Sequence, residues 1–582
     1  MAQAPIPSAP LSGGRLPTGV DPGSWTLWWN HNREAYFDSI AWTRNVSNPF
    51  FTSSARRVVA LEAATIQEGI VPALLEALEH NPSAELRRGV LLSLAKIGHR
   101  QDGQLGDSNL QELLLAHLTD SNQLVAETAC ISLGVLDRPG VMPILASLLQ
   151  DGEAGRKLLE KERVPHRMRA YAAYGIALLG QRTEMADVRR FASHVLIQAL
   201  QEDCGATPDM HVAAVIGLGM VGSGKQPIEV LLQLLSDKRE HTAVRAHAPA
   251  ALAKLAAEAY PQTRQQVVAT LSEYAGRRSE KAPIQEGSLL ALGQLLACGP
   301  QDAAARKELI QIAKGGKSQE RGWAMIALAQ IAARPEPRAM DPMAGSFDIQ
   351  NVLLKSLSRS SHTLEPWIAL SLGVLAHGLR TQGESVPASL GRALSDGLKA
   401  TNSPENALAY GIGLGLARTP KGLETLTAKL SKFDVNTRSL LSTAIGLQGD
   451  PEAQAALVDE LHEARHAPGT LISSAHALAL LNHTSVVGEL VAMFQSCDCL
   501  LSAAGITQAL ARTRHPEAVA PLLKLLADGE TTDAHRALAA VALGNLAEKE
   551  ERPWSLRLSQ DVNYRAPVAT LTESDYGILL LP

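Results

Sequence analysis

A short apolar pattern that returns along most of the chain is the feature that most constrains its fold. In each copy a large residue, usually Leu, is followed by Gly or Ala within an apolar helical stretch, and we call this two-residue unit an anchor pair. Anchor pairs lie at residues 94–95, 133–134, 176–177, 218–219, 252–253, 292–293, 328–329, 372–373, 414–415, 445–446, 478–479 and 543–544. One further position, Thr507-Gln508, departs from the pattern. Such a repeat predicts an array that grows by stacking similar units.

The spacing of the anchor pairs predicts two helices in each repeat. Twelve steps separate residues 94 and 543, so the mean period is about 37 residues, in the range of two-helix repeats. Between anchor pairs lies a more polar helical stretch, such as PIEVLLQLLSD at 227–237. Gly inside a helix costs about 1 kcal/mol relative to Ala, so its recurrence at one position indicates that a neighbouring helix approaches closely there. We therefore expect an all-α solenoid of about thirteen helical pairs over residues 52–551.

Three of the units carry a resemblance to a known class of repeat. AELRRGVLLSLAKIG (84–98), LVAETACISLGVLDRPGVMPILASLLQDG (124–152) and HPEAVAPLLKLLADGETTDAHRALAAVALGNLA (515–547) resemble HEAT repeats of the bacterial, phycobilisome-lyase-like type. The resemblance covers roughly residues 52–551 and implies the fold. It does not select a function, because proteins of this shape include bilin lyases, assembly scaffolds and DNA-repair proteins.

The composition argues against several classes of partner. Lys plus Arg number 54 and Asp plus Glu number 59, giving a net charge of -5, so nucleic acid is not expected as the main partner. No run of 18 or more apolar residues occurs, and no membrane span is expected. Paired arginines near helix ends are expected to form a solvated, salt-bridged surface, and they stand at 56–57, 87–88, 189–190 and 277–278.

Residues 211–225, HVAAVIGLGMVGSGK, imitate two nucleotide-binding motifs. Gly217-x-Gly219-x-x-Gly222 has the spacing of a dinucleotide-binding turn, and the following Gly-Lys almost completes a phosphate-binding loop. A dinucleotide turn needs a strand before the glycines and a helix that opens at them. Here the glycines lie within and at the end of a predicted helix, and Gln226 replaces the hydroxyl residue that binds Mg²⁺. We interpret the stretch as a solenoid helix and expect no cofactor.

The stretch HEARH at residues 462–466 has the spacing of a zinc-hydrolase helix. In that chemistry two histidines one turn apart bind zinc and the Glu activates a water molecule. Projection onto a helix places both histidines on the polar flank, and the buried side carries Leu457, Val458, Leu461 and Ala464. A catalytic zinc ion requires a shielded cleft, so a solvated helix face is the favoured interpretation and adventitious metal binding is a second one.

The cysteines do not form a recognisable framework. An odd, scattered set is unsuited to a disulfide scaffold, and it consists of Cys130, Cys204, Cys298, Cys497 and Cys499. The only close pair, Cys497-x-Cys499, has neither a second pair nor a histidine in ligand register nearby. We expect each cysteine to be a buried thiol.

The N-terminal part differs from the repeats. Residues 1–24 are Pro-rich and predict a disordered or extended arm, and MAQAPIPSAP resembles the start of a mature exported protein, which favours an exported or periplasmic location over the cytoplasm. Residues 25–51 form an aromatic segment predicted to cap the first repeat. Surplus aromatic residues could also bind another protein, and these candidates are Trp25, Trp28, Trp29, Tyr36 and Trp42.

The C-terminal part, residues 552–582, abandons the helical period. Short apolar alternations predict an extended, non-helical segment lying along the last repeats. This tail and the aromatic head together resemble a group of uncharacterised, often exported bacterial HEAT-repeat proteins, which supplies no activity. A loop at 333–362, rich in Pro, Met and Ser, is a further candidate contact surface.

These features favour a non-enzymatic protein-binding or assembly scaffold that uses the curved surface of the solenoid. The alternative is an enzyme, either a zinc hydrolase at residues 462–466 or a bilin-lyase-like protein. The partner would be another protein of unknown identity, and the sequence leaves the oligomeric state open.

Overall fold

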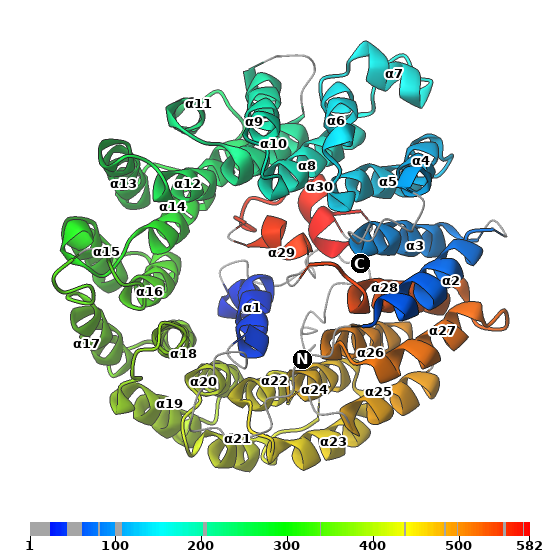
Figure 1. Ribbon diagram of the computed structural model, residues 1–582. Coiled ribbons are helices and arrows are strands. Elements are labelled where there is room, and N and C mark those ends of the chain that lie inside the picture. The colour runs from blue at the N-terminus through cyan, green and yellow to red at the C-terminus, as the bar shows by residue number, and fades with distance from the viewer. Residues whose placement is uncertain are drawn as a thin grey trace. The chain divides into compact units, whose positions relative to one another are not determined.

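The computed structural model is helical throughout its described part (Figure 1). It describes residues 24–42, 61–79, 82–98, 107–201, 207–337, 339–435, 438–481, 485–497, 499–550, 554–560, 562–573 and 576–581. The chain divides into two compact units. Unit 1 contains residues 1–8, 18–55 and 252–483, and unit 2 contains residues 9–17, 56–251 and 484–582.

Thirteen helices that carry the anchor positions form a buried layer. They are α3 (Ala84–Ile97), α5 (Gln123–Leu136), α8 (His166–Arg182), α10 (Pro208–Val221), α12 (Thr242–Ala257), α14 (Ala282–Leu295), α16 (Ser318–Ala332), α18 (Glu365–Thr381), α20 (Pro404–Ala417), α22 (Ser439–Gln448), α24 (Pro468–Leu481), α26 (Leu500–Thr513) and α28 (Asp533–Leu546). Every anchor position, including Thr507-Gln508, thus lies in a helix. This confirms the expectation of about thirteen helical pairs.

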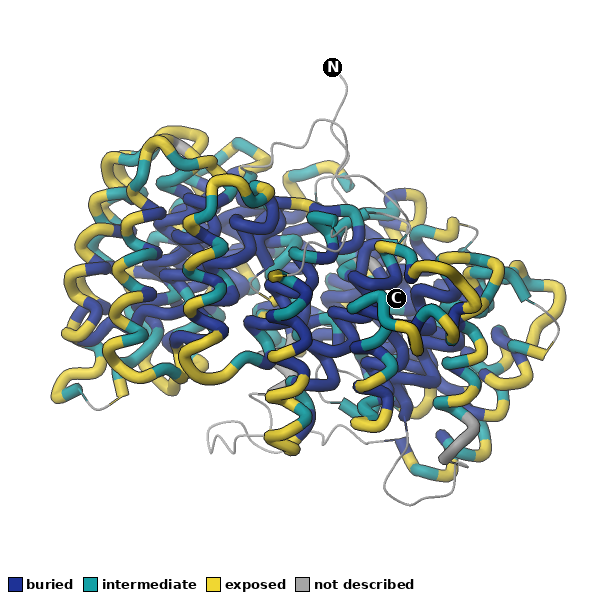
Figure 2. Tube along the Cα trace, turned by 90° about the horizontal axis from the view of Figure 1, so that it is seen from above, coloured by how far each residue is buried: buried dark blue, intermediate teal, exposed yellow. Residues whose placement is uncertain are grey.

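The helices between them form an exposed layer. They are α2 (Val71–Glu76), α4 (Asp107–Ala116), α6 (Met142–Leu149), α9 (Ala186–Gln201), α11 (Lys225–Ser236), α13 (Pro261–Gly276), α15 (Ala303–Gly315), α17 (Ser346–Leu357), α19 (Ala388–Ala400), α21 (Gly422–Leu430), α23 (Ala453–Glu463), α25 (Ser485–Gln495) and α27 (Val519–Ala527). Figure 2 shows that the described helices divide between dark blue, buried tube and yellow, exposed tube. The difference follows from the sequence, because a helix that is apolar all round must be covered on every side, whereas an amphipathic helix keeps one face in water.

Arginines at one register join the two layers. The fourth residue of several buried-layer helices donates a hydrogen bond from its guanidinium Nε to a carbonyl near the end of the preceding exposed-layer helix, where carbonyls lack partners within their own helix. These bonds run from Arg169 to Leu149, from Arg245 to Leu235, from Arg321 to Ala313 and from Arg536 to Leu526. This role was not predicted, although the sequence shows that Arg recurs three residues after the helix start.

In each arginine pair within the described residues, one member forms an ion pair. Arg87 pairs with Asp120 at 3.5 Å, and the guanidinium groups of Arg190 and Arg277 each contact a carboxylate on their own helix. Arg56 and Arg57 lie outside the described residues.

The anchor glycines allow close helix approach, as the sequence predicts. A Cβ atom placed on Gly219 would lie 2.7 Å from the Cα of Ala251, and one on Gly293 would lie 2.8 Å from the Cα of Ala327. Each contact joins one buried-layer helix to the next one along the chain. Any side chain at these positions would force neighbouring repeats apart.

The last repeat of unit 2 packs directly on the first. In Figure 1 the orange helix α28 lies beside the blue helix α3. A Cβ atom on the anchor residue Gly544 would lie 2.7 Å from the Cα of Ser93, so this contact has the same geometry as those between consecutive repeats. The Ser93 hydroxyl donates to the Ala540 carbonyl at 2.9 Å, and the Ser83 N–H donates to Asp533 at 2.8 Å. We call this α3–α28 contact the seam.

The seam changes the predicted role of the aromatic segment. Helix α1 (Trp25–Trp42) belongs to unit 1, where it contacts α18 and α24. The first repeat is instead covered by α27 and α28. The expectation that the aromatic segment caps the first repeat is therefore wrong, because the last repeat presents a complementary helix surface and leaves no open end at α3.

Candidate protein-binding surface

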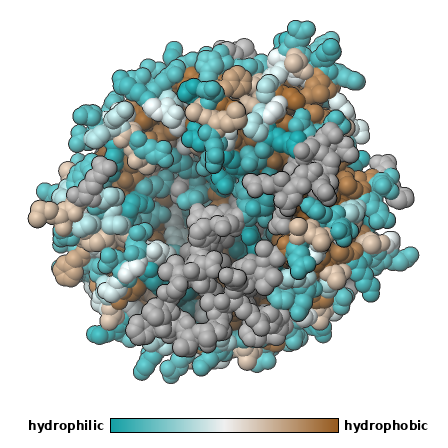
Figure 3. Space-filling model, viewed as in Figure 1, coloured by the Kyte–Doolittle hydropathy of each residue, from teal (hydrophilic) through white to brown (hydrophobic). Residues whose placement is uncertain are grey.

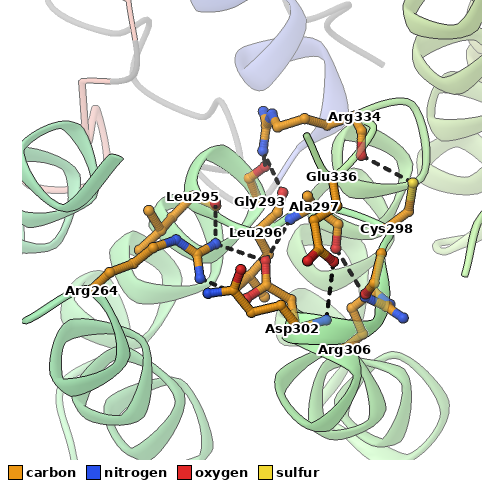
Figure 4. Close-up of polar contacts among 12 residues, drawn as sticks. Arg264, Gly293, Leu295, Leu296, Ala297, Cys298, Asp302, Arg306, Arg334 and Glu336 are labelled. Carbon is orange, nitrogen blue, oxygen red and sulfur yellow. Dashed lines mark hydrogen bonds and ion pairs between the residues drawn. The ribbon is translucent and has the colours of Figure 1, made fainter. Parts of the chain in front are cut away.

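In unit 1 the loop between α16 and α17 projects one large apolar side chain from a firmly held backbone, and the start of α17 projects a second. The loop spans residues 333–345, of which 338 lies outside the described residues, and it is shorter than the sequence suggested because Ser346–Leu357 form α17. The contacts that hold it come from the end of α14 and the start of α15 (Figure 4).

Arg334 fixes the beginning of the loop. Its guanidinium Nη1 donates to the carbonyl of Gly293 at 2.8 Å and to that of Leu296 at 2.6 Å, at the C-terminal end of α14. These carbonyls have no partner within their helix, so the charged donor satisfies them and holds the loop to the preceding repeat.

Cys298 fixes the loop from its other side. Its main-chain N–H and its thiol both approach the Arg334 carbonyl at 3.0 Å, and its carbonyl accepts from the Gly345 N–H at 2.7 Å. Burial raises the pKa of the Cys298 thiol to about 11, so the thiol stays protonated and serves as a hydrogen-bond donor. The Glu336 carboxylate accepts a further hydrogen bond from the Gln301 N–H at 3.0 Å.

An ion pair between Arg264 and Asp302 fixes the backbone to which the loop is bonded. Arg264 donates two hydrogen bonds to the Asp302 carboxylate, at 2.8 and 2.7 Å, and Asp302 also accepts from the Ala297 N–H at 2.8 Å. Arg306 donates to the carbonyls of Ala297 and Gly299. The polar groups in Figure 4 are thus occupied in holding the backbone, and the arrangement is structural.

Two large apolar side chains at the loop and the start of α17 are exposed to solvent. Met340 is 106% exposed and Phe347, at the start of α17, is 68% exposed. The carboxylates of Asp341 and Asp348 are exposed next to them in the chain. On the face shown in Figure 3 apolar residues form small patches separated by polar ones. Met340 on the fixed loop and Phe347 at the start of α17 are therefore the candidate contact.

The aromatic residues of α1 are mostly buried. Trp25, Trp28 and Trp29 are 1% exposed or less, and Tyr36 lies 5.7 Å from the Trp29 ring, as the predicted shared face requires. The Trp42 side chain lies outside the described residues. With α1 in this position the three buried indoles offer almost no surface to another protein, so their proposed partner-binding role requires α1 to move.

The C-terminal segment lies on the buried layer of unit 2 and not along the last repeats, which corrects the prediction. It contains the short helices α29 (Trp554–Ser559) and α30 (Ala569–Thr572) and a 3-10 turn at Ile578–Leu580, joined by irregular chain. Short apolar alternations do not distinguish an extended strand from such buried turns. Helices α29 and α30 contact α8, and α30 also contacts α10.

Polar contacts to the main chain hold this segment in place. Asp209 accepts the Thr570 N–H at 2.6 Å, and the Asn563 amide donates to the Ala246 carbonyl at 2.8 Å. His247 Nε2 lies 3.0 Å from the Ala566 carbonyl, and since a carbonyl only accepts, Nε2 carries the proton. Near the chain end the Arg167 guanidinium lies 3.5 Å above the Tyr576 ring.

These contacts make the stability of unit 2 sensitive to mild acid. Burial lowers the pKa of His247 from 6.5 to about 4, so the unfolded chain binds a proton that the folded chain rejects between these values. Stability from this group is complete above pH 6.5 and is lost as the pH falls toward 4, by roughly 3 kcal/mol at most. We expect His247→Gln to reduce the dependence of the free energy of unfolding on pH between 6.5 and 4, measured by urea unfolding. An unchanged slope would assign the acid sensitivity to other groups.

The HEARH stretch has the geometry of a solvated helix end. Helix α23 ends at Glu463, a 3-10 turn follows, and His462, Glu463 and His466 are all exposed. The Glu463 carboxylate accepts from Arg438 at 2.7 Å. Among the residues that the structure describes, no three His, Cys, Asp or Glu side chains come close enough together to hold a metal ion.

The glycines of residues 211–225 have structural roles. Gly217 and Gly219 lie inside α10, and the Gly222 N–H donates to the Leu218 carbonyl at 2.8 Å at the end of that helix. A Cβ atom on Gly217 would lie 3.1 Å from the Cβ of Ala177 on the neighbouring helix. The interpretation as a solenoid helix is confirmed.

The cysteines divide into two groups. Cys130 and Cys298 are buried as expected, whereas Cys499 is exposed and Cys497 is partly exposed. The expectation of a buried thiol is therefore wrong for the Cys497-x-Cys499 pair, because it stands in the turn before α26 instead of inside a helix. Cys204 lies outside the described residues.

One part of the chain matches a known family of repeats. Residues 71–160 match the family model for HEAT repeats. These residues contain α2, α3, α4, α5 and α6 and end before α8 begins at His166. No curated protein matches the chain. No helix among the described residues has both the length and the apolar character required to cross a membrane.

Several solved structures align with this chain at low identity. Human deoxyhypusine hydroxylase aligns with 18% identity over 53% of this chain and 96% of its own, with a TM-score of 0.21. Kap121p bound to Nup53p aligns with 14% identity over 85% of this chain and 55% of its own, with a TM-score of 0.37. Importin beta aligns with 13% identity over 81% of this chain and 75% of its own, with a TM-score of 0.35. Alignments this weak contribute nothing to the assignment of function.

Proposed function

We propose that the chain is a non-enzymatic protein-binding scaffold and that the 333–345 loop with the start of α17 contacts the partner. The observation that carries the proposal is the exposure of Met340 and Phe347 on a backbone fixed at both ends by Arg334 and Cys298. A fixed loop loses little conformational entropy on binding, so its apolar side chains contribute more of their burial energy to affinity.

The chemistry of the loop defines the partner surface. Met340 and Phe347 require an apolar pocket, and the exposed carboxylates of Asp341 and Asp348 favour basic residues around it. The partner is therefore proposed to be a protein with an apolar pocket and a basic rim.

The aromatic residues of α1 are proposed as a second contact that forms only when this helix leaves α18 and α24. They comprise Trp25, Trp28, Trp29, Tyr36 and Trp42. The resemblance to phycobilisome-lyase-like and exported bacterial HEAT-repeat proteins stays a prediction, and the proposal takes no activity from it.

Crosslinking and pull-down from the native cells, followed by titration of the purified partner, tests the loop. We expect the double variant Met340→Ser with Phe347→Ser to bind the partner at least ~10-fold more weakly than the parent chain. Tyr260→Ser is the matched control, because Tyr260 is 83% exposed elsewhere in unit 1. Unchanged binding by the double variant would reject the loop as the contact. Weakened binding by a folded Trp28→Ala, Trp29→Ala variant would support the α1 contact.

A further inference from the structure

Two cysteines stand at the start of α26 in unit 2, where their thiols are accessible. Cys499 is the N-cap residue of this helix and is exposed, and Cys497 is partly exposed. The Cys497 thiol donates to the carbonyl of Cys499 at 3.4 Å, so its sulfur lies against the backbone of the other cysteine. Leu500, the first residue of α26, is 44% exposed and adds an apolar contact beside the thiols.

The helix end favours the thiolate form of Cys499. The Ser502 N–H contributes most to lowering the pKa of the Cys499 thiol, and the Ser502 hydroxyl and the Leu501 N–H add to this effect. Unpaired N–H groups and the helix dipole stabilise a negative charge at this position. Since the thiolate is the reactive form, this is the environment of a nucleophilic cysteine.

The buried cysteines have the opposite character. Burial raises the pKa of Cys130 far above its usual range and that of Cys298 to about 11, so both thiols stay protonated at neutral pH. The same chain thus supplies two unreactive cysteines against which Cys499 can be measured.

We propose that Cys497 and Cys499 form a redox-active dithiol that exchanges disulfides with a disulfide-bonded peptide or small molecule. Cys499 is the attacking residue and Cys497 the resolving residue. This activity is independent of the 333–345 loop, which lies in unit 1.

The exchange proceeds in two balanced steps. The Cys499 thiolate attacks one sulfur of the substrate disulfide, a mixed disulfide forms, and the other substrate sulfur leaves as a thiolate. Cys497 then loses its proton to solvent and attacks the Cys499 sulfur, which releases the second substrate thiolate. The substrate disulfide is reduced to two thiols, and the Cys497–Cys499 dithiol is oxidised to a disulfide. The reverse sequence donates the disulfide to a dithiol partner.

Alkylation of the full chain tests the reactivity of Cys499. In a short pulse of iodoacetamide at pH 7, with peptides analysed by mass spectrometry, we expect Cys499 to react at least ~10-fold faster than Cys130 and Cys298. The pH at which its rate is half-maximal should lie below that of glutathione measured in parallel. A Cys499 rate equal to or below the glutathione rate across the pH range would overturn the proposal.

Glutathione disulfide tests the exchange itself. In the parent chain we expect an internal Cys497–Cys499 disulfide and release of two glutathione molecules. Cys497→Ser should stop at the mixed disulfide on Cys499, and Cys499→Ser should react at least ~10-fold more slowly at Cys497 than the parent does at Cys499. Accumulation of the mixed disulfide in the parent chain, or equal rates in Cys499→Ser and the parent, would overturn the assignment of roles. A parent chain that stays fully reduced while glutathione disulfide oxidises a control dithiol peptide would overturn the site.

Discussion

A chain that ends at residue 560 is expected to lose most of the stability of unit 2. The removed segment includes Tyr564, Leu571 and Ile578, which are 3%, 0% and 0% exposed. Burial of a large apolar side chain stabilises a fold by about 1.5 to 3 kcal/mol, so these three together contribute roughly 5 to 9 kcal/mol as an upper estimate. This sum is comparable to the ~5 to 15 kcal/mol that holds a typical domain together.

The loss extends to polar groups that remain behind. Without the segment the Asp209 carboxylate, the His247 ring and the Ala246 carbonyl each lose the partner described above. Because truncation also opens these groups to water, each lost hydrogen bond costs about 0.5 to 1.5 kcal/mol net. We expect amide hydrogen exchange in α8 and α10 to increase first, because these helices hold the segment.

Urea unfolding followed by circular dichroism measures the effect. Pro567→Ala is the matched control, since Pro567 belongs to the same segment but is exposed and should leave the unfolding midpoint unchanged. A truncated chain with the parent midpoint and parent hydrogen exchange would show that the segment adds no stability.

The same magnitudes argue against a role for this segment as a displaceable ligand. A tethered segment experiences an effective concentration of about 1 mM, so a competing peptide with identical contacts would have to reach millimolar levels to displace half of it. The segment therefore acts as a permanent part of unit 2. For this reason the proposed partner contact lies at the exposed 333–345 loop and not at α8 and α10.

The sequence carries the repeat architecture because each helix pair is specified locally. The anchor pairs, with a large apolar residue beside Gly or Ala, predict both the buried layer and the close approach later seen at Gly219 and Gly293. The polar stretches between them, such as 227–237, predict the exposed layer. Neither inference needs knowledge of residues far along the chain.

The contacts between distant residues were not predictable in this way. Ser93 and Ala540 are hydrogen-bonded across the seam, yet nothing in their local sequence distinguishes them from other buried residues. The aromatic head was correctly seen as unusual, but its burial depends on α18 and α24, several hundred residues later. The pattern 497–499 was judged by its metal-ligand spacing, and its exposure at a helix end became visible only in the structure.

The second large expected effect is a loss of stability when a side chain is introduced at the seam. We expect Gly544→Leu to destabilise unit 2 by about 3 kcal/mol, because the new side chain would meet Ser93 on α3, whose Cα lies 2.7 Å from the position of the added Cβ. Gly373→Leu in unit 1 is the positive comparison, since a Cβ there would lie 2.8 Å from the carbonyl oxygen of Gly413 in the next repeat. Gly529→Leu is the neutral control, because nothing lies within 4 Å of its added Cβ.

The three variants separate a closed seam from an open one. If α28 packs on α3 in solution, we expect the urea-unfolding midpoint of Gly544→Leu to fall by about as much as that of Gly373→Leu. If the first and last repeats were apart, the Leu side chain at 544 would meet only water and its variant would unfold like Gly529→Leu, with a small gain from the better helix propensity of Leu. A rise in hydrogen exchange confined to α3 and α28 in Gly544→Leu would further show that the cost arises at the seam. An anchor glycine is required only where a neighbouring helix is present, so the tolerance of position 544 reports directly on whether the last repeat has a neighbour.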